Sequence, residues 1–274
     1  MAPWPEILWC LANRPCSQAS VVGWAEAYVY VLLIVSILHF VLFVVWESRF
    51  AAEPIMPLTI WNSPSFSSMI VSALLSFMSV GLAVWYVSQW NILIRGYSTF
   101  LNAAAFSPLM VCGVIGAFLS AHLIRYIAAQ YILTIGSLAC VISLSILATM
   151  PTHGSYWSGI FPAMIITGLG PDFLFTAAQI IASNTVPRAQ QGVAGSLIGT
   201  LFSYGLSTGL GIAGTVEHYT NDGGHNVIQG YRNGMYLGIG MAAFAAVVAF
   251  LLVKIPKDER DGWGEDDFPT EQQA

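Results

Sequence analysis

The sequence has 274 residues, of which 56% are hydrophobic and only 8% are charged, and its mean hydropathy is +0.70. Because a water-soluble domain of this length exposes far more charge, the composition excludes an ordinary soluble protein and indicates a polytopic membrane protein. The formal net charge is −5, and the acidic stretch 256–274 supplies much of it. No cluster of basic residues supports a nucleic-acid-binding protein.

Apolar stretches long enough to cross about 30 Å of hydrocarbon as helices recur along the chain. The seven stretches are residues 27–46, 67–90, 101–121, 127–149, 157–182, 192–216 and 234–253. The segments between them are rich in Gly, Pro, Asn and Ser, which favour turns. The sequence therefore predicts an all-α polytopic membrane protein with about seven transmembrane helices and no separate soluble domain.

The distribution of the nine basic residues predicts the orientation of the chain. With an N-terminus outside, six of them fall on the cytoplasmic side: Arg49, Arg125, Arg188, Lys254, Lys257 and Arg260. Because basic residues concentrate in cytoplasmic loops, we expect the N-terminus outside and the C-terminus in the cytoplasm. Glu6 stands where a secretory signal carries basic residues, so residues 1–24 are interpreted as an extracytoplasmic segment and not as a cleaved signal.

The sequence offers no support for an enzyme. It shows no nucleophile–base pairing, no His/Glu cluster with metal-ligand spacing and no phosphate-binding loop. The cysteines, Cys10, Cys16, Cys112 and Cys140, also lack metal-ligand spacing. Cys112 and Cys140 lie in apolar stretches and are interpreted as packing residues. Cys10 and Cys16 are consistent either with a disulfide or with free thiols. We therefore predict no enzymatic activity, no bound metal and no cofactor.

One acidic residue, Asp172, lies close to the middle of an apolar span, in the stretch GLGPDFLFTAAQ (168–179). Helical spacing places Thr176, Gln179 and Ser183 on the same face. An ionised carboxylate at the bilayer centre costs roughly 2.5–3.5 kcal/mol on insertion scales, so it needs a cavity, a partner or a proton. We interpret Asp172, Thr176 and Gln179 as substrate- or proton-binding residues. The alternative is an acid that only satisfies backbone groups freed by Pro171.

Small residues and a proline mark two spans as sites of bending or close packing. Pro171 removes a backbone donor, and Gly168 and Gly170 weaken the same turn. In the sixth span, Gly195, Gly199, Gly205 and Gly209 form small-xxx-small pairs that let membrane helices approach closely. Tyr204, near the centre of that span, is a further candidate substrate contact.

A polar and aromatic group ends the second span. Gln89 and Asn91 lie beside Trp85, Tyr86 and Trp90. Such a group is typical either of the lining of an outer cavity or of residues that anchor a helix at the membrane interface. The sequence leaves both interpretations open.

Four segments together resemble one known family. They are VVGWAEAYVYVLLIVSILHFVLFVVWESRFAAEPIMPL, IRGYSTFLNAAAFSP, GLGPDFLFTAAQIIASNTVPRAQQGVAGSLIGTLFSYGLSTGLGIAGTVE and GYRNGMYLGIG. They resemble the fungal major facilitator superfamily, specifically its fourteen-helix drug:proton antiporters of the aminotriazole-resistance type. The resemblance covers about residues 18–255.

The resemblance implies a division of the chain. Residues 25–48 are similar to an extra linker helix, 49–66 to a cytoplasmic loop, 67–255 to the six-helix C-terminal half, and 256–274 to a disordered cytoplasmic tail. An N-terminal half has no counterpart in this sequence. In such folds the substrate site lies between the two halves near the membrane midplane. The resemblance therefore implies that Asp172 faces a central cavity.

The function implied by the resemblance is secondary active transport, with proton-coupled efflux of a toxic or secondary-metabolite-like small molecule. The implied partners are the lipid bilayer, the substrate, protons, and a missing N-terminal half or a second copy. The plasma membrane is the expected location, with the vacuolar membrane as the alternative. Two other hypotheses are a non-transporting half-transporter or accessory protein, and a seven-helix receptor or retinal protein. The last span has no interior lysine for retinal.

Overall fold

The computed structural model describes residues 64–152, 154–185 and 191–254, together with isolated positions between residues 31 and 46. Along the continuous ranges the chain forms α3 (Pro64–Gln89), the π-helix η2 (Trp90–Ile94), α4 (Thr99–Ala105), α5 (Ser107–Leu123), α6 (Ala129–Thr149), η3 (Tyr156–Ser158), α7 (Ile160–Thr185), α8 (Gln191–Thr220), η5 (Asp222–Gly224) and α9 (Val227–Leu252). No strand occurs in these described ranges, which confirms the predicted all-α class.

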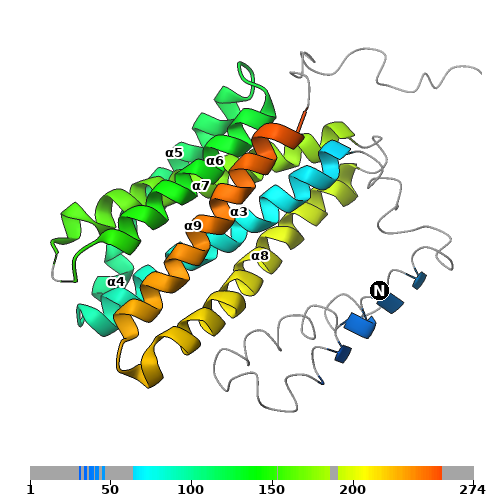
Figure 1. The fold of residues 1–274 in the computed structure, drawn as a ribbon. Coiled ribbons are helices and arrows are strands. Elements are labelled where there is room, and N and C mark those ends of the chain that lie inside the picture. The colour runs from blue at the N-terminus through cyan, green and yellow to red at the C-terminus, as the bar shows by residue number, and fades with distance from the viewer. Residues whose placement is uncertain are drawn as a thin grey trace, which may run out of the picture.

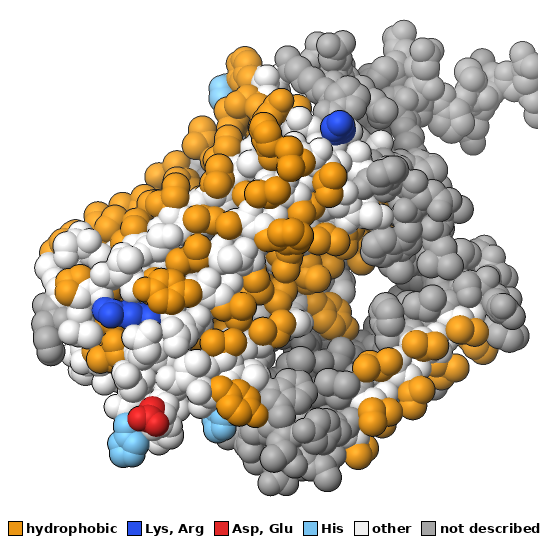
Figure 2. Space-filling view, viewed as in Figure 1, with side chains coloured by type: hydrophobic (Ala, Val, Ile, Leu, Met, Phe, Trp, Pro, Cys, Tyr) orange, Lys and Arg blue, Asp and Glu red, His pale blue; other side chains and the backbone are white. Residues whose placement is uncertain are grey.

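Six of the described helical stretches are long and apolar enough to cross a membrane. They coincide with the predicted spans from 67–90 onward. The predicted span 27–46 lies mostly outside the described residues, as do the predicted segments 1–24 and 256–274 and most of 49–66. Hydrophobic side chains cover the flank of the bundle in Figure 2, and the charged side chains in that view lie toward its ends. The protein is therefore a multi-pass integral membrane protein.

The last two helices are longer than the sequence predicts. α8 continues to Thr220 instead of ending at residue 216, and α9 begins at Val227 instead of at residue 234. The turn between them is tight, because Asp222 and the two glycines after it adopt positive φ angles of 52°, 62° and 94°. The polar start of α9 is helical because Tyr231 is buried against the bundle. Tertiary burial thus overrides the turn-like composition of this stretch.

The helices form one bundle with α3 packed against α6, α7, α8 and α9 (Figure 1). α7 packs between α5 and α6, while α5 packs chiefly against α7. α5 and α8 are the least buried of the long helices. α3 and α8 end at the same end of the bundle at which α7 and α9 begin. We call it the distal end. Two faces, on α5 and α8, are therefore open.

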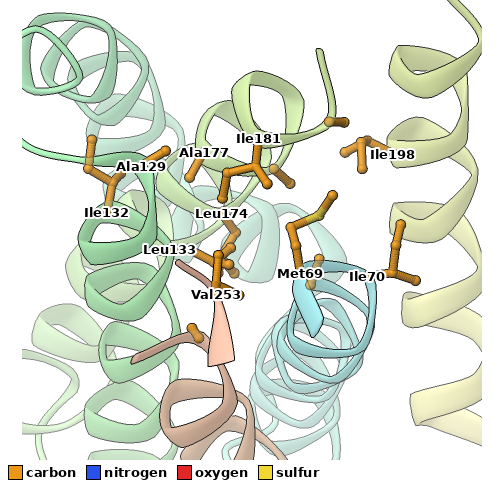
Figure 3. Packing of buried hydrophobic residues seen from close by; sticks show 14 of the residues in the cluster. Met69, Ile70, Ala129, Ile132, Leu133, Leu174, Ala177, Ile181, Ile198 and Val253 are labelled. Atoms are coloured by element: carbon orange, nitrogen blue, oxygen red, sulfur yellow. The ribbon is translucent and has the colours of Figure 1, made fainter. Parts of the chain in front are cut away.

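The hydrophobic core has two parts, one toward each end of the bundle. Figure 3 shows the first part, where Met69 of α3, Leu133 of α6 and Leu174 of α7 meet Val253, just after α9. The second part surrounds Trp90 at the distal end. Because lipid tails are as apolar as these side chains, close packing holds the helices together more than a hydrophobic driving force does.

Serines spaced along α3 add hydrogen bonds between helices that the sequence analysis did not predict. Ser72 and Ser79 donate to backbone carbonyls of α9, at Ala245 and Gly238, each over 2.9 Å. The Ser76 hydroxyl lies 2.8 Å from a serine hydroxyl of α6. All three serines are fully buried. Such bonds between membrane helices are worth about 0.6 kcal/mol on average, and they fix the register of α3.

Candidate functional site

Asp172 lies at the seam between α7 and α5. It is the thirteenth of the 26 residues of α7, so its carboxyl group lies near the middle of a membrane span. Its Oδ2 atom faces Gly113 and Gly116, and a Cβ added to either glycine would lie 3.4 Å from it. The side chain is only partly buried. No residue in the described ranges forms a hydrogen bond or an ion pair with it that offsets its charge. The carboxyl group is therefore partly exposed at this seam, and its predicted role in binding substrate or protons stays a prediction.

Thr176, Gln179 and Ser183 form a polar stripe on the face of α7 that carries Asp172. The stripe is divided between two neighbouring helices. The Thr176 hydroxyl lies 3.0 Å from the Ser120 hydroxyl of α5. Gln179 instead donates from Nε2 to the carbonyl oxygen of Gly195 in α8, over 3.1 Å. Ser183 donates to a carbonyl of its own helix. Thr176 and Gln179 thus hold α5 and α8 against α7, and their predicted role in substrate binding stays a prediction.

The glycines near Asp172 let α7 approach both of its neighbours. A Cβ on Gly168 would lie 2.6 Å from the carbonyl oxygen of Leu109 and 2.9 Å from the Cβ of Cys112, both of α5. Gly170 faces α6 instead, with the sulfur of Cys140 at 3.4 Å. α7 runs through Pro171 as one uninterrupted helix. The turn that precedes the acid is therefore tightly packed, and its predicted role as a hinge stays a prediction.

The predicted glycines of α8 have different surroundings. A Cβ on Gly205 would lie 2.6 Å from the Cβ of Phe77, and one on Gly209 would lie 2.8 Å from the carbonyl oxygen of Met78, so both contact α3 closely. Gly195 faces the Gln179 side chain, whereas a Cβ on Gly199 would meet nothing within 4 Å.

Tyr204 is the fourteenth of the 30 residues of α8. Its side chain is partly buried. Within the described residues, no hydrogen bond joins Tyr204 to Asp172. The structure thus gives the two predicted ligand residues similar depths on separate helices, without bringing their side chains together.

The aromatic and polar group at the end of α3 is split. Tyr86, Trp90 and Asn91 are buried, whereas Trp85 is 47% exposed. Asn91 donates from Nδ2 to the Oδ1 atom of Asn102 over 3.0 Å, which ties η2 to α4. The buried members therefore hold the distal end together, and Trp85 is placed as an interfacial anchor would be.

Glu217 is a second acid within a spanning helix, and the sequence analysis missed it. Since α8 extends to Thr220, Glu217 belongs to its last turn. It lies on the face of α8 that packs on α3 and α9. A Cβ on Gly230 of α9 would lie 3.2 Å from the Glu217 Cγ, and Ala213, one turn earlier in α8, accepts a hydrogen bond from the Tyr86 hydroxyl of α3. A sequence signal was present, because the buried small residues Gly205, Gly209 and Ala213 recur every four positions and Glu217 continues that series.

No model of a known protein family matches the chain. Individual proteins do match. The chain is 35% identical over 240 residues to the low affinity ammonium transporter of Saccharomyces cerevisiae, across 87% of this chain and 46% of that protein. It is 31% identical over 241 residues to the aminotriazole resistance protein of the same yeast, across 88% of this chain and 44% of that protein. It is 34% identical over 246 residues to efflux pump terG of Aspergillus terreus, across 89% of this chain and 46% of that protein.

These three relatives are named as a transporter, a resistance protein and an efflux pump and not as enzymes, in agreement with the prediction. The chain spans about half the length of the curated relatives that it matches. The described bundle contains the six spans expected of one half of such a protein. The chain therefore belongs to the fungal major facilitator superfamily, and its described spans are consistent with the C-terminal half of such a protein.

Proposed function

We propose that the chain supplies one half of the pathway of a secondary active transporter that exports a toxic or secondary-metabolite-like small molecule in exchange for protons. Asp172 carries this proposal, because its carboxyl group lies midway along α7, partly exposed and without an offsetting partner among the described residues. Acids at such a depth mark substrate or ion pathways and proton relays. The names of the relatives, an efflux pump and a resistance protein among them, support the same class.

A complementary set of helices completes the pathway in this proposal. α8 exposes polar side chains at Ser196, Thr200 and Ser203, whose hydroxyls donate to carbonyls of their own helix. An exposed polar stripe on a spanning helix suits a water-filled cavity or another protein surface better than it suits lipid. We propose that an N-terminal half or a second copy of the chain covers this face and the open face of α5.

The test is substrate-dependent proton movement in sealed vesicles that hold the protein in its native membrane. A pH-sensitive dye reports proton flux while ammonium, aminotriazole and ethidium are offered in turn, the first two because the relatives' names include them. We expect Asp172→Asn to remove the substrate-dependent flux, because the amide keeps the size of the side chain but binds no proton.

The matched control is Asp222→Asn, which makes the same chemical change in an exposed turn at the distal end. This variant keeps the flux, and both variants reach the membrane in normal amount. Unchanged flux in the Asp172→Asn vesicles contradicts the proposal that this acid couples transport to protons.

We propose that the C-terminus lies in the cytoplasm and the N-terminus outside, in the plasma membrane. The excess of basic residues on one side supports this orientation. An antibody against residues 259–274 is expected to stain the rim of cells only after their membranes are permeabilised. Staining of intact cells contradicts the orientation, and staining of the vacuolar rim contradicts the location.

A further inference from the structure

Unpaired buried polar atoms gather at the distal end of the bundle. Within the described ranges, the buried side-chain atoms without a hydrogen-bond partner are Nε1 of Trp90, Oδ1 of Asn91, Nε and Nη2 of Arg95, and Nε of Arg232. These residues lie where α3 and η2 end or near the start of α9. All of these atoms except the Asn91 oxygen are N–H donors. Because buried donors are normally paired, they indicate a partner that carries acceptors.

Arg95 is the least satisfied of these residues. Arg232 donates from Nη2 to the carbonyl oxygen of Met150 over 3.1 Å, and Asn91 donates to Asn102 over 3.0 Å. In the part of the chain that the structure describes, the Arg95 side chain forms no hydrogen bond or ion pair. A guanidinium stays charged in proteins, and burying its nitrogens without a counter-charge is costly. Arg95 therefore needs an anionic partner.

The π-helix η2 places Trp90 one turn before Arg95. The Arg95 backbone N–H donates to the Trp90 carbonyl oxygen over 3.0 Å, with the five-residue spacing of a π-helix. The Trp90 side chain is fully buried, and its Nε1 is unpaired. Gly96 follows with a φ angle of 67°, and a Cβ there would meet nothing within 4 Å. The turn after η2 therefore leaves open space next to Arg95.

Arg95 lies at the level of the membrane surface. One described span ends at Ile94 and the next begins at Thr99, so Arg95 belongs to the short connection between them. Lipid headgroups flank the hydrocarbon core at such helix ends. Large apolar side chains on both sides of this connection are exposed, Leu93 to 62% and Phe100 to 86%. A cation beside lipid-facing apolar side chains fits an amphipathic anion better than a free inorganic one.

We propose that Arg95 binds the phosphate group of a phospholipid at the distal membrane surface. Its two buried, unpaired nitrogens, Nε and Nη2, are the adjacent pair of donors that a guanidinium offers to two oxygens of one phosphate. The acyl chains of the lipid then lie along the exposed apolar side chains of η2 and α4. This site is separate from Asp172 and does not depend on transport.

The test is the thermal unfolding midpoint of the purified full chain in maltoside detergent, with dioleoyl phosphatidylglycerol, dioleoylglycerol or inorganic phosphate added. The two lipids have the same acyl chains, and only the first carries a phosphate. We expect phosphatidylglycerol to raise the midpoint by roughly 5 °C at about 100 times its dissociation constant, and the other two to leave it unchanged. Arg95→Gln is expected to lose this rise. Arg95→Lys should keep only part of it, because lysine has no fork of donors.

The matched control is Arg125→Gln, which makes the same change at an exposed arginine between α5 and α6, at the opposite end of the bundle, and should keep the rise. An equal rise with dioleoylglycerol or with inorganic phosphate overturns the proposal. So does a rise that Arg95→Gln keeps or that Arg125→Gln loses. If Arg95→Gln does not fold, the comparison of the two lipids on the native chain and on Arg95→Lys decides. The flux test of Asp172→Asn bears on the proposed function alone, so the two ideas can fail independently.

Discussion

Two carboxylic acids within spanning helices lie in differently packed surroundings. Asp172 lies at the seam between α5 and α7, and Glu217 lies at a junction of α3, α8 and α9 that includes Tyr86, Gly230 and Gly234. At the seam, the acid faces two glycines of one helix, and Cβ atoms added there would still make ordinary contacts of 3.4 Å with its Oδ2. At the junction, the glycines of α9 lie against the acid and against Tyr86 so closely that a Cβ on Gly234 would lie 2.1 Å from the Tyr86 oxygen. Both acids are partly buried, so the two sites differ in how tightly the helices around them are packed.

The difference shows that glycines beside a membrane acid can serve two purposes. In the junction, the missing side chains are replaced by groups from α3 and α8, which fixes the three helices relative to one another. At the seam, the glycines of α5 leave room next to a partly exposed carboxyl group. Small residues permit close approach of helices in both places. The two sites therefore differ in how completely neighbouring helices fill the space that the glycines leave.

The largest expected effect that tests this contrast comes from Gly234→Ala in the tightly packed junction. The added methyl group meets the buried Tyr86 side chain, with three of its atoms within 2.7 Å, so the ring must shift within the core or α3 and α9 must move apart. We expect a loss of about 3 kcal/mol in the free energy of unfolding, at the upper end for overpacked cores. The measurement is the midpoint of thermal unfolding in detergent.

Gly240→Ala is the control for this variant, because Gly240 lies on the same helix and a Cβ there would meet nothing within 4 Å. This change should leave stability unchanged or raise it slightly, since alanine favours a helix by about 1 kcal/mol over glycine. Equal midpoints for the two variants contradict the view that the junction is tightly packed.

Much of this fold could be predicted from hydropathy, because crossing lipid demands long apolar helices whatever their partners are. That physical constraint explains why six predicted spans coincide with described helices. The division of the stripe below Asp172 could not be predicted, because helical spacing places Thr176 and Gln179 on one face without saying which neighbouring helix each side chain meets. Nor could the partners of the α3 serines be predicted, since they come from distant parts of the sequence.

Glu217 was missed for a related reason. The hydropathy of α8 falls before the helix ends, so the predicted span stopped at residue 216, one position before the acid. Tyr86 of α3 and Tyr231 of α9 are both buried, and their rings are 5.5 Å apart. This packing keeps the ends of α8 and α9 helical, and it exists only in the folded bundle. Composition therefore locates an acid in the middle of a span more easily than one in its last turn.

A smaller effect is expected at the open seam, from Gly168→Ala one turn before Asp172. The added methyl group meets the backbone of α5, with the Leu109 carbonyl oxygen at 2.6 Å, so no rotamer change can relieve the contact. We expect a loss of about 2 kcal/mol in the free energy of unfolding, less than at Gly234, because α5 packs chiefly against α7 and is free to move outward. The matched control is Gly199→Ala on α8, where a Cβ would meet nothing within 4 Å. If Gly168→Ala is as harmful as Gly234→Ala, the seam is as rigid as the junction, and the contrast between a loosely and a tightly packed site no longer holds.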